Sequence, residues 1–273
     1  MLVTSKIFLL LFLVLDLSFA ALIQVWRDTS APSVERDPDS LYLWTSVATF
    51  DKKVTDGQLV SIAEDGYRSM LASAWNNIQT RRLPTVMSAM VHQESEDRWI
   101  VYLASSVKGK KSLYYPVNKG NENPSSQDPN RRRCGRVFPS IPTSLKNALN
   151  QCRSNSQQTD QHTNDAKCGE MSILLEVAAR TGRDPLRVAN EPGTRIVAWR
   201  GGYSDSGEYL PGRSKIAPPC STDGFGCDQT MKALTPNLDP IKNRIPREDY
   251  LSRNAPLRVE PQELFPLPRP ERP

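Results

Sequence analysis

Residues 168–180, Cys-Gly-Glu followed by MSILLEVAAR, carry the strongest structural signal in this sequence. The run is strongly apolar, so it predicts a buried helix that begins at the Cys-x-Glu triplet. TRIVAWR at 194–200 follows, and its β-branched and aromatic residues predict a buried strand. Further on, Cys220 comes directly after two prolines, and Cys227 opens DQTMKAL at 228–234, which predicts a second helix start. Three cysteines therefore fall at or near two predicted helix starts.

The sequence before this stretch predicts a helix and a hairpin. From Thr55 to Asn77, apolar residues recur at three- and four-residue spacing, and Thr55 or Asp56 can cap the start. TVMSAMV at 85–91 and WIVYLAS at 99–105 are short apolar runs with a charged stretch between them. That arrangement predicts a β-hairpin with a polar tip.

Cys-x-Glu at one helix start and two cysteines near another form the pattern of a zinc-dependent deaminase. Three protein ligands hold the metal and leave its fourth position for water. Thiolates at helix N-termini gain from the positive end of the helix dipole. In this sequence the predicted zinc ligands are Cys168, Cys220 and Cys227, and the predicted catalytic proton shuttle is Glu170. Gly169 and the Cys220 region would lie at the pocket.

The stretch from Thr55 to Leu234 resembles the cytidine-deaminase-like fold, and especially its divergent secreted and toxin-type members. The resemblance implies an α/β protein with a three-layer α/β/α mixed sheet and two zinc-bearing helices on one face. It also implies hydrolytic deamination of a nucleobase, either as a free nucleoside or in nucleic acid. Zinc is the implied cofactor.

The sequence departs from this family in three places. Six residues, instead of two to four, separate Cys220 from Cys227, and the first predicted ligand is Cys168 instead of the commoner histidine. The prolines after Cys227 argue against the strands that usually complete the sheet, so we expect a sheet truncated at its C-terminal strands. The family's substrate-binding residues are therefore not carried over, and the substrate-binding residues stay unknown.

The five cysteines leave two pairing schemes open. Zinc on three thiolates plus a Cys134–Cys152 disulfide uses all five. Two disulfides and one buried thiol is the alternative, which is at least as common in exported proteins. That scheme favours a second function: a non-catalytic secreted interaction or effector protein that uses the fold as a disulfide-stabilised scaffold.

Residues 1–20 have the composition of a secretory signal peptide. Lys6 precedes an apolar run at 7–15, and Ser18-Phe19-Ala20 offers small residues for cleavage after Ala20. No later stretch is long and apolar enough to cross a bilayer, so the mature protein is expected to be secreted without a membrane segment. Its formal net charge of +5 permits a polyanionic partner without requiring one.

The sequence after the signal peptide divides into three parts by composition. After the signal peptide, residues 21–50 predict an extended segment that leads into the domain. Residues 51–235 are the predicted deaminase-like domain, and 236–273 form a Pro-rich tail. Within the tail, FPLPRP at 265–270 can adopt polyproline II and bind a protein partner, although a disordered tail is the simpler account.

Several other polar residues are candidates for a functional role. Arg131–Arg133 and Lys108–Lys111 form basic clusters that could contact phosphates, but solvated loops are the simpler interpretation. His92 at the hairpin tip and His162 in a polar loop are expected to be exposed and without function. Ser105-Ser106 could face the mouth of the pocket.

Overall fold

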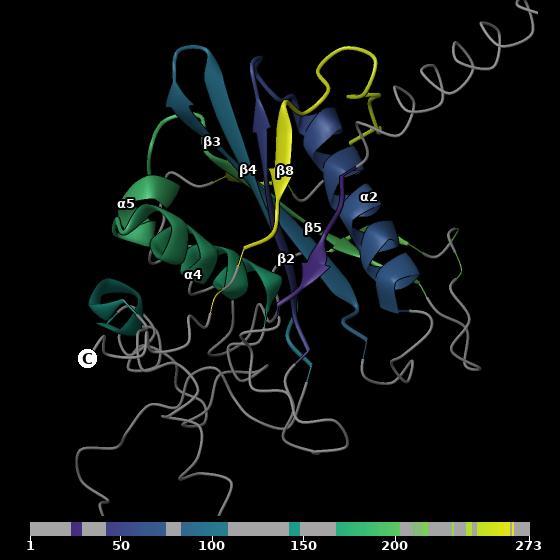
Figure 1. Ribbon diagram of the computed structural model, residues 1–273, viewed down its shortest axis with the longest axis horizontal. Coiled ribbons are helices and arrows are strands. Elements are labelled where there is room, and N and C mark those ends of the chain that lie inside the picture. The colour runs from purple at the N-terminus through teal and green to yellow at the C-terminus, as the bar shows by residue number, and fades with distance from the viewer. Residues whose placement is uncertain are drawn as a thin grey trace, which may run out of the picture.

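The computed structural model describes a sheet with helices on both faces (Figure 1). The described residues are 23–28, 42–74, 83–108, 142–147, 168–202, 210, 212, 214–217, 231, 239–241, 245–262 and 264. Helices and a mostly antiparallel sheet occur together in them, which confirms the predicted α/β class at that level.

The helices and strands follow one another along the chain in the order β1 (Trp26–Arg27), β2 (Trp44–Phe50), α2 (Asp56–Ala74), β3 (Val86–Ser95), β4 (Arg98–Ser105), α4 (Gly169–Thr181), α5 (Pro185–Ala189), β5 (Arg195–Arg200), β6 (Lys215–Ile216), β7 (Asp239–Pro240) and β8 (Arg258–Glu260). The main path of the sheet is β1-β2-β4-β3-β5-β6. β7 pairs with β5 in parallel, and β8 pairs with β2 antiparallel.

The predicted hairpin is confirmed as β3 and β4, which pair antiparallel. Both strands run further toward the tip than the apolar runs indicate, so His92 lies inside β3, opposite Ile100. The expectation that His92 is an exposed tip residue is therefore wrong: it is buried. The strands pair through backbone N–H and C=O groups, which every residue there has. The pairing can therefore continue beyond the point where the apolar side chains end.

Helix α2 begins with a capping box. The Thr55 hydroxyl accepts from the backbone N–H of Gln58 at 3.2 Å, and the Gln58 side chain accepts from the N–H of Thr55 at 3.0 Å. Its apolar side packs on one face of the sheet, where Ala89 and Val91 of β3 contribute. The choice between Thr55 and Asp56 as the cap is thus settled by two reciprocal hydrogen bonds.

Helix α4 packs on the other face. Met90, which lies between Ala89 and Val91, belongs to the cluster that α4 covers together with Tyr102 and Ile196. Because successive side chains of a strand point to opposite faces, these two apolar clusters lie on opposite sides of the sheet. Figure 1 shows the same arrangement, with α2 and α4 separated by the strands.

The sheet extends beyond the range 51–235 that the sequence predicts for the domain. β2 is buried along its whole length and pairs with β4 over six residues, so the segment before residue 51 contributes a core strand instead of a leading segment. After residue 235, β8 pairs with β2 and Tyr250 is buried. The predicted tail therefore belongs in part to the folded unit, and its prolines did not prevent β7 from pairing.

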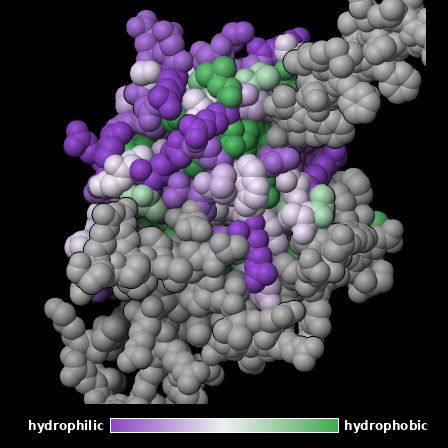
Figure 2. All heavy atoms as spheres, viewed as in Figure 1, coloured by the Kyte–Doolittle hydropathy of each residue, from purple (hydrophilic) through white to green (hydrophobic). Residues whose placement is uncertain are grey.

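The described surface mixes hydrophilic and hydrophobic residues on the face seen in Figure 2. Leu257 is the one large hydrophobic residue among those described that is exposed. Within the part of the chain that the structure covers, no helix is both long and apolar enough to cross a membrane. The predicted signal peptide (1–20), Arg131–Arg133, His162 and the segment 265–270 lie outside the described residues.

Candidate functional site

The Cys-x-Glu triplet lies at the N-terminus of α4, as the sequence predicts. Cys168 is the N-cap residue, with an extended backbone, and its carbonyl accepts from the N–H of Ser172 at 3.1 Å. Glu170 is in the first turn, where a negative charge is favoured by the helix dipole. Both side chains are buried, with residue exposures of 7% for Cys168 and 5% for Glu170. A buried carboxyl and a buried thiol therefore sit two residues apart at the positive end of one helix.

Gly169 explains how this helix start comes so close to the sheet. A Cβ at this position would lie 2.3 Å from Ser88 Oγ and 3.1 Å from the carbonyl oxygen of Ala104. Ser88 and Ala104 face each other on β3 and β4. The missing side chain thus lets α4 begin directly on the central hairpin, and any other residue would push the helix away.

A small cavity adjoins Glu170 between α4 and β5. Its described lining residues are Glu170, Ile196, Val197, Ala198, Ala217, Met231 and Ile241. Its volume of about 10 Å³ corresponds to roughly one water molecule. Glu170 is the only ionisable residue among the described lining residues, and the others are apolar.

The described residues nearest in sequence to Cys220 and Cys227 both line this cavity. Ala217 lies three residues before Cys220, and Met231 lies four residues after Cys227. Both Ala217 and Met231 line the cavity beside Glu170.

The predicted zinc set is only partly within the described residues. Cys168 and Glu170 are described, whereas Cys220 and Cys227 are not, and neither are Cys134 and Cys152 of the predicted disulfide. Among the described residues, no group of three or more His, Cys, Asp or Glu side chains could hold a metal. Because two of the three predicted ligands lie outside those residues, the set stays a prediction.

Two buried hydroxyl groups without a hydrogen-bond partner among the described atoms lie on β3 and just after β4. Ser88 is fully buried and its Oγ has no hydrogen-bond partner among the described atoms. Ser106, beyond the end of β4, has a similarly buried and unpartnered Oγ in the described part of the chain. Ser105 has a structural role instead, because its hydroxyl accepts from the N–H of Trp44 at 3.0 Å and donates to the carbonyl of Ser106. Sequence reasoning missed Ser88, because a serine within an apolar strand gives no local signal.

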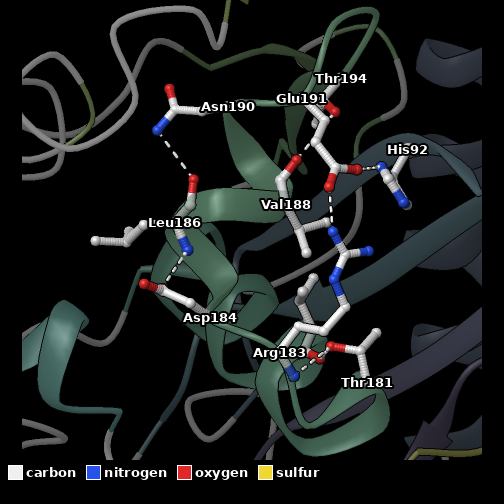
Figure 3. A network of polar contacts seen from close by, with 10 residues as sticks. His92, Thr181, Arg183, Asp184, Leu186, Val188, Asn190, Glu191 and Thr194 are labelled. Atoms are coloured by element: carbon white, nitrogen blue, oxygen red, sulfur yellow. Dashed lines mark hydrogen bonds and ion pairs between the residues drawn. The ribbon is translucent and has the colours of Figure 1, made fainter.

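A second polar cluster lies away from the triplet, beyond the C-terminus of α4 (Figure 3). Glu191 approaches His92 on one side, with 3.2 Å between its Oε2 and Nδ1, and pairs with Arg183 on the other. Although this distance is short, the Nδ1 atom of His92 makes no hydrogen bond within the described part of the chain. Burial lowers the pKa of His92, and the nearby Glu191 only partly opposes this. The cluster joins β3 to the loops around α5, and we interpret it as structural.

The basic cluster at 108–111 is described only at its first residue. Tyr42 and Lys108 exchange two backbone hydrogen bonds, from the N–H of Tyr42 at 2.8 Å and from the N–H of Lys108 at 3.0 Å. The backbone of Lys108 is therefore fixed beside the chain that leads into β2. The other basic residues of both clusters lie outside the described residues.

Comparisons with known protein families, with curated proteins and with solved structures returned no match.

Proposed function

We propose that this chain is a secreted, zinc-dependent hydrolytic deaminase of a nucleobase, on a three-layer cytidine-deaminase-like fold. The order of elements supports the fold: a helix, an antiparallel hairpin, a helix that starts with Cys-x-Glu, and a strand beside the hairpin. α2 and α4 cover opposite faces of the sheet. β7 adds a parallel neighbour to β5, as a mixed sheet requires.

One observation carries the proposal. The buried carboxyl of Glu170 adjoins a cavity whose lining includes Ala217 and Met231, the described residues that flank the segment with Cys220 and Cys227. Cys168 begins the same helix two residues before Glu170. Two of the four predicted residues are thus at this end of α4, and the chain on either side of the other two reaches the same cavity, which supports a three-thiolate zinc site.

In this proposal Cys168, Cys220 and Cys227 hold the zinc ion. The metal would supply a water molecule of lowered pKa and so a hydroxide near neutral pH. Glu170 would take one proton of that water and pass it to the ring nitrogen as the hydroxyl adds to the ring carbon. It would then take the proton of the added hydroxyl and pass it to the departing amine, so that the carbonyl forms as ammonia leaves. The net reaction consumes one water, forms a carbonyl at the ring carbon and releases one ammonia.

The other described residues of the cavity contribute by excluding solvent. Ile196, Ala198 and Met231 present apolar groups beside the carboxyl of Glu170. In such surroundings the interactions of a carboxylate with charge that develops during the reaction are stronger than in bulk water. Ser88 and Gly169 have a positioning role, because their close contact sets how near the start of α4 lies to the sheet.

The test combines metal analysis with two variants. Purified mature protein should contain about one zinc per chain and release ammonia from at least one member of a panel of cytosine and adenine bases, nucleosides and single-stranded nucleic acids. Glu170→Gln should lower turnover by about 10²–10⁴-fold and retain the metal. Cys168→Ala should lose the metal, whereas Glu96→Gln, the same chemical change at an exposed turn, should alter neither.

Two results would contradict the proposal. One is undiminished ammonia release by Glu170→Gln. The other is a disulfide that involves Cys168, Cys220 or Cys227, found by peptide mapping of the native protein without reduction. The disulfide result would favour the non-catalytic scaffold, for which no described contact gives separate support. N-terminal sequencing of the exported protein tests the predicted cleavage after Ala20.

A further inference from the structure

Glu176 is a buried acid in the middle of α4 that the proposed chemistry does not use. Its side chain is completely buried, and α4 packs there against the sheet face that contains Val47 and Tyr102. Neither carboxyl oxygen has a hydrogen-bond partner among the described residues. An unpaired buried carboxylate is among the least favourable groups in a protein interior, so this position is informative.

The charged and titratable groups around Glu176 do not stabilise its ionised form enough to offset burial. Asp28, after β1, adds a second negative charge, and its carboxyl accepts from the N–H of Leu264 at 2.8 Å. Tyr102 of β4 is also nearby: burial, and after it the charge of Glu176, raise the pKa of its hydroxyl. Arg180, one turn further along α4, is the opposing cation, but it pairs with Glu260 of β8 at 3.1 Å.

We propose that Glu176 makes the packing of α4 on the sheet depend on a bound proton, so that α4 is held in place when this carboxyl is neutral and loosened when it ionises. The inference concerns the helix and the sheet, and it stands whether or not the chain is an enzyme. Its consequence for the site is direct, because Cys168 and Glu170 lie at the start of the same helix.

The direction of the pH dependence follows from the burial. Burial raises the pKa of Glu176 well above its usual value of 4.5, which it regains in the unfolded chain. The folded protein then binds the proton more tightly than the unfolded chain does. The contribution to stability is fully present below about pH 4.5 and is lost as the pH rises through the folded-state pKa.

The experiment compares the unfolding equilibrium of wild-type protein and Glu176→Gln at a series of pH values. Above about pH 4.5, the unfolding constant of the wild type divided by that of Glu176→Gln should rise by up to tenfold per pH unit. The rise should end once the pH has passed the folded-state pKa of Glu176. Glu96→Gln is the matched control, since it removes an exposed carboxyl from the turn between β3 and β4. It should follow the wild-type curve throughout.

A second variant and a local measurement keep the test decisive. Glu176→Met fills a similar volume without an ionisable group and should also remove the pH dependence. Hydrogen exchange in wild-type protein, corrected for intrinsic rates, should accelerate with rising pH in α4 more than in α2. Parallel curves for wild type and both variants, or equal acceleration in the two helices, would overturn the proposal.

Discussion

Gly169 at the start of α4 lies against Ser88 of β3 so closely that a Cβ on the glycine would come 2.3 Å from the serine hydroxyl. The contact joins two segments that are 81 positions apart in the sequence (169 − 88). It fixes the height of α4 above the sheet at the residues between Cys168 and Glu170. The glycine of the triplet therefore has a packing role that is separate from any chemistry of its neighbours.

Gly169→Ala should destabilise the protein by about 1–3 kcal/mol, because the added methyl group overpacks the contact with β3. Urea unfolding measures this directly. Gly212→Ala is the control, since no described atom lies within 4 Å of a Cβ there. Combining Gly169→Ala with Ser88→Gly should recover part of the loss, and purely additive effects would argue against this contact as the cause.

His92 should weaken the protein at acidic pH. Burial lowers its pKa below the usual 6.5, so the unfolded chain binds the proton more tightly than the folded protein does. The stability is present above about pH 6.5 and is lost as the pH falls through the folded-state pKa. We call this fall in the free energy of unfolding below about pH 6.5 the acid limb. His92→Gln should flatten it when unfolding is measured at a series of pH values.

The second histidine of the chain provides the control for that measurement. His162→Gln should leave the acid limb in place, because the sequence predicts an exposed residue there. If His162→Gln removes the limb and His92→Gln does not, the assignment is wrong. The stability contributed by His92 falls as the pH drops below about 6.5, whereas that of Glu176 falls as the pH rises above about 4.5. The two ranges overlap, so the contributions are separated by comparing the His92→Gln and Glu176→Gln curves.

Gly182 should be needed where α4 ends. Its φ of 64° is in the left-handed region, and its N–H donates to the carbonyl of Ala178 at 2.9 Å. Gly182→Ala should cost about 1 kcal/mol in thermal or urea unfolding. The cost is purely conformational because no described atom would contact the new methyl group. Gly182→Asn should be better tolerated, and equal losses in both variants would point to another cause.

Tyr250 should report whether the region after residue 235 belongs to the folded unit. Its ring is buried, and its hydroxyl donates to Asp65 of α2 at 2.9 Å. Tyr250→Ala should destabilise the whole protein by about 3–5 kcal/mol, and Tyr250→Phe by only about 1 kcal/mol. Far-UV circular dichroism during urea unfolding measures both. A negligible effect of Tyr250→Ala would show that this region does not stabilise the folded unit, as expected for the predicted tail.

The local elements could be predicted because their signals lie within short windows. The hairpin follows from two apolar runs, and the α4 helix from CGEMSILLEVAAR and its start at Cys168. The limits of the folded unit could not be predicted in the same way. β2 and β8 join the sheet through long-range pairing, and the prolines between 236 and 261 masked the second of them.

The candidate site shows the same difference between local sequence signals and long-range packing. The sequence alone determined which residue types could act together, Cys168, Glu170, Cys220 and Cys227, and that two of them begin an apolar helix. Only the tertiary structure placed Ser88 beneath Gly169 and brought Ala217 and Met231 into one cavity lining with Glu170. It also buried Glu176 with no hydrogen-bond partner among the described residues. Periodicity and capping depend on neighbours a few residues away, whereas burial and close approach depend on which distant segments pack together.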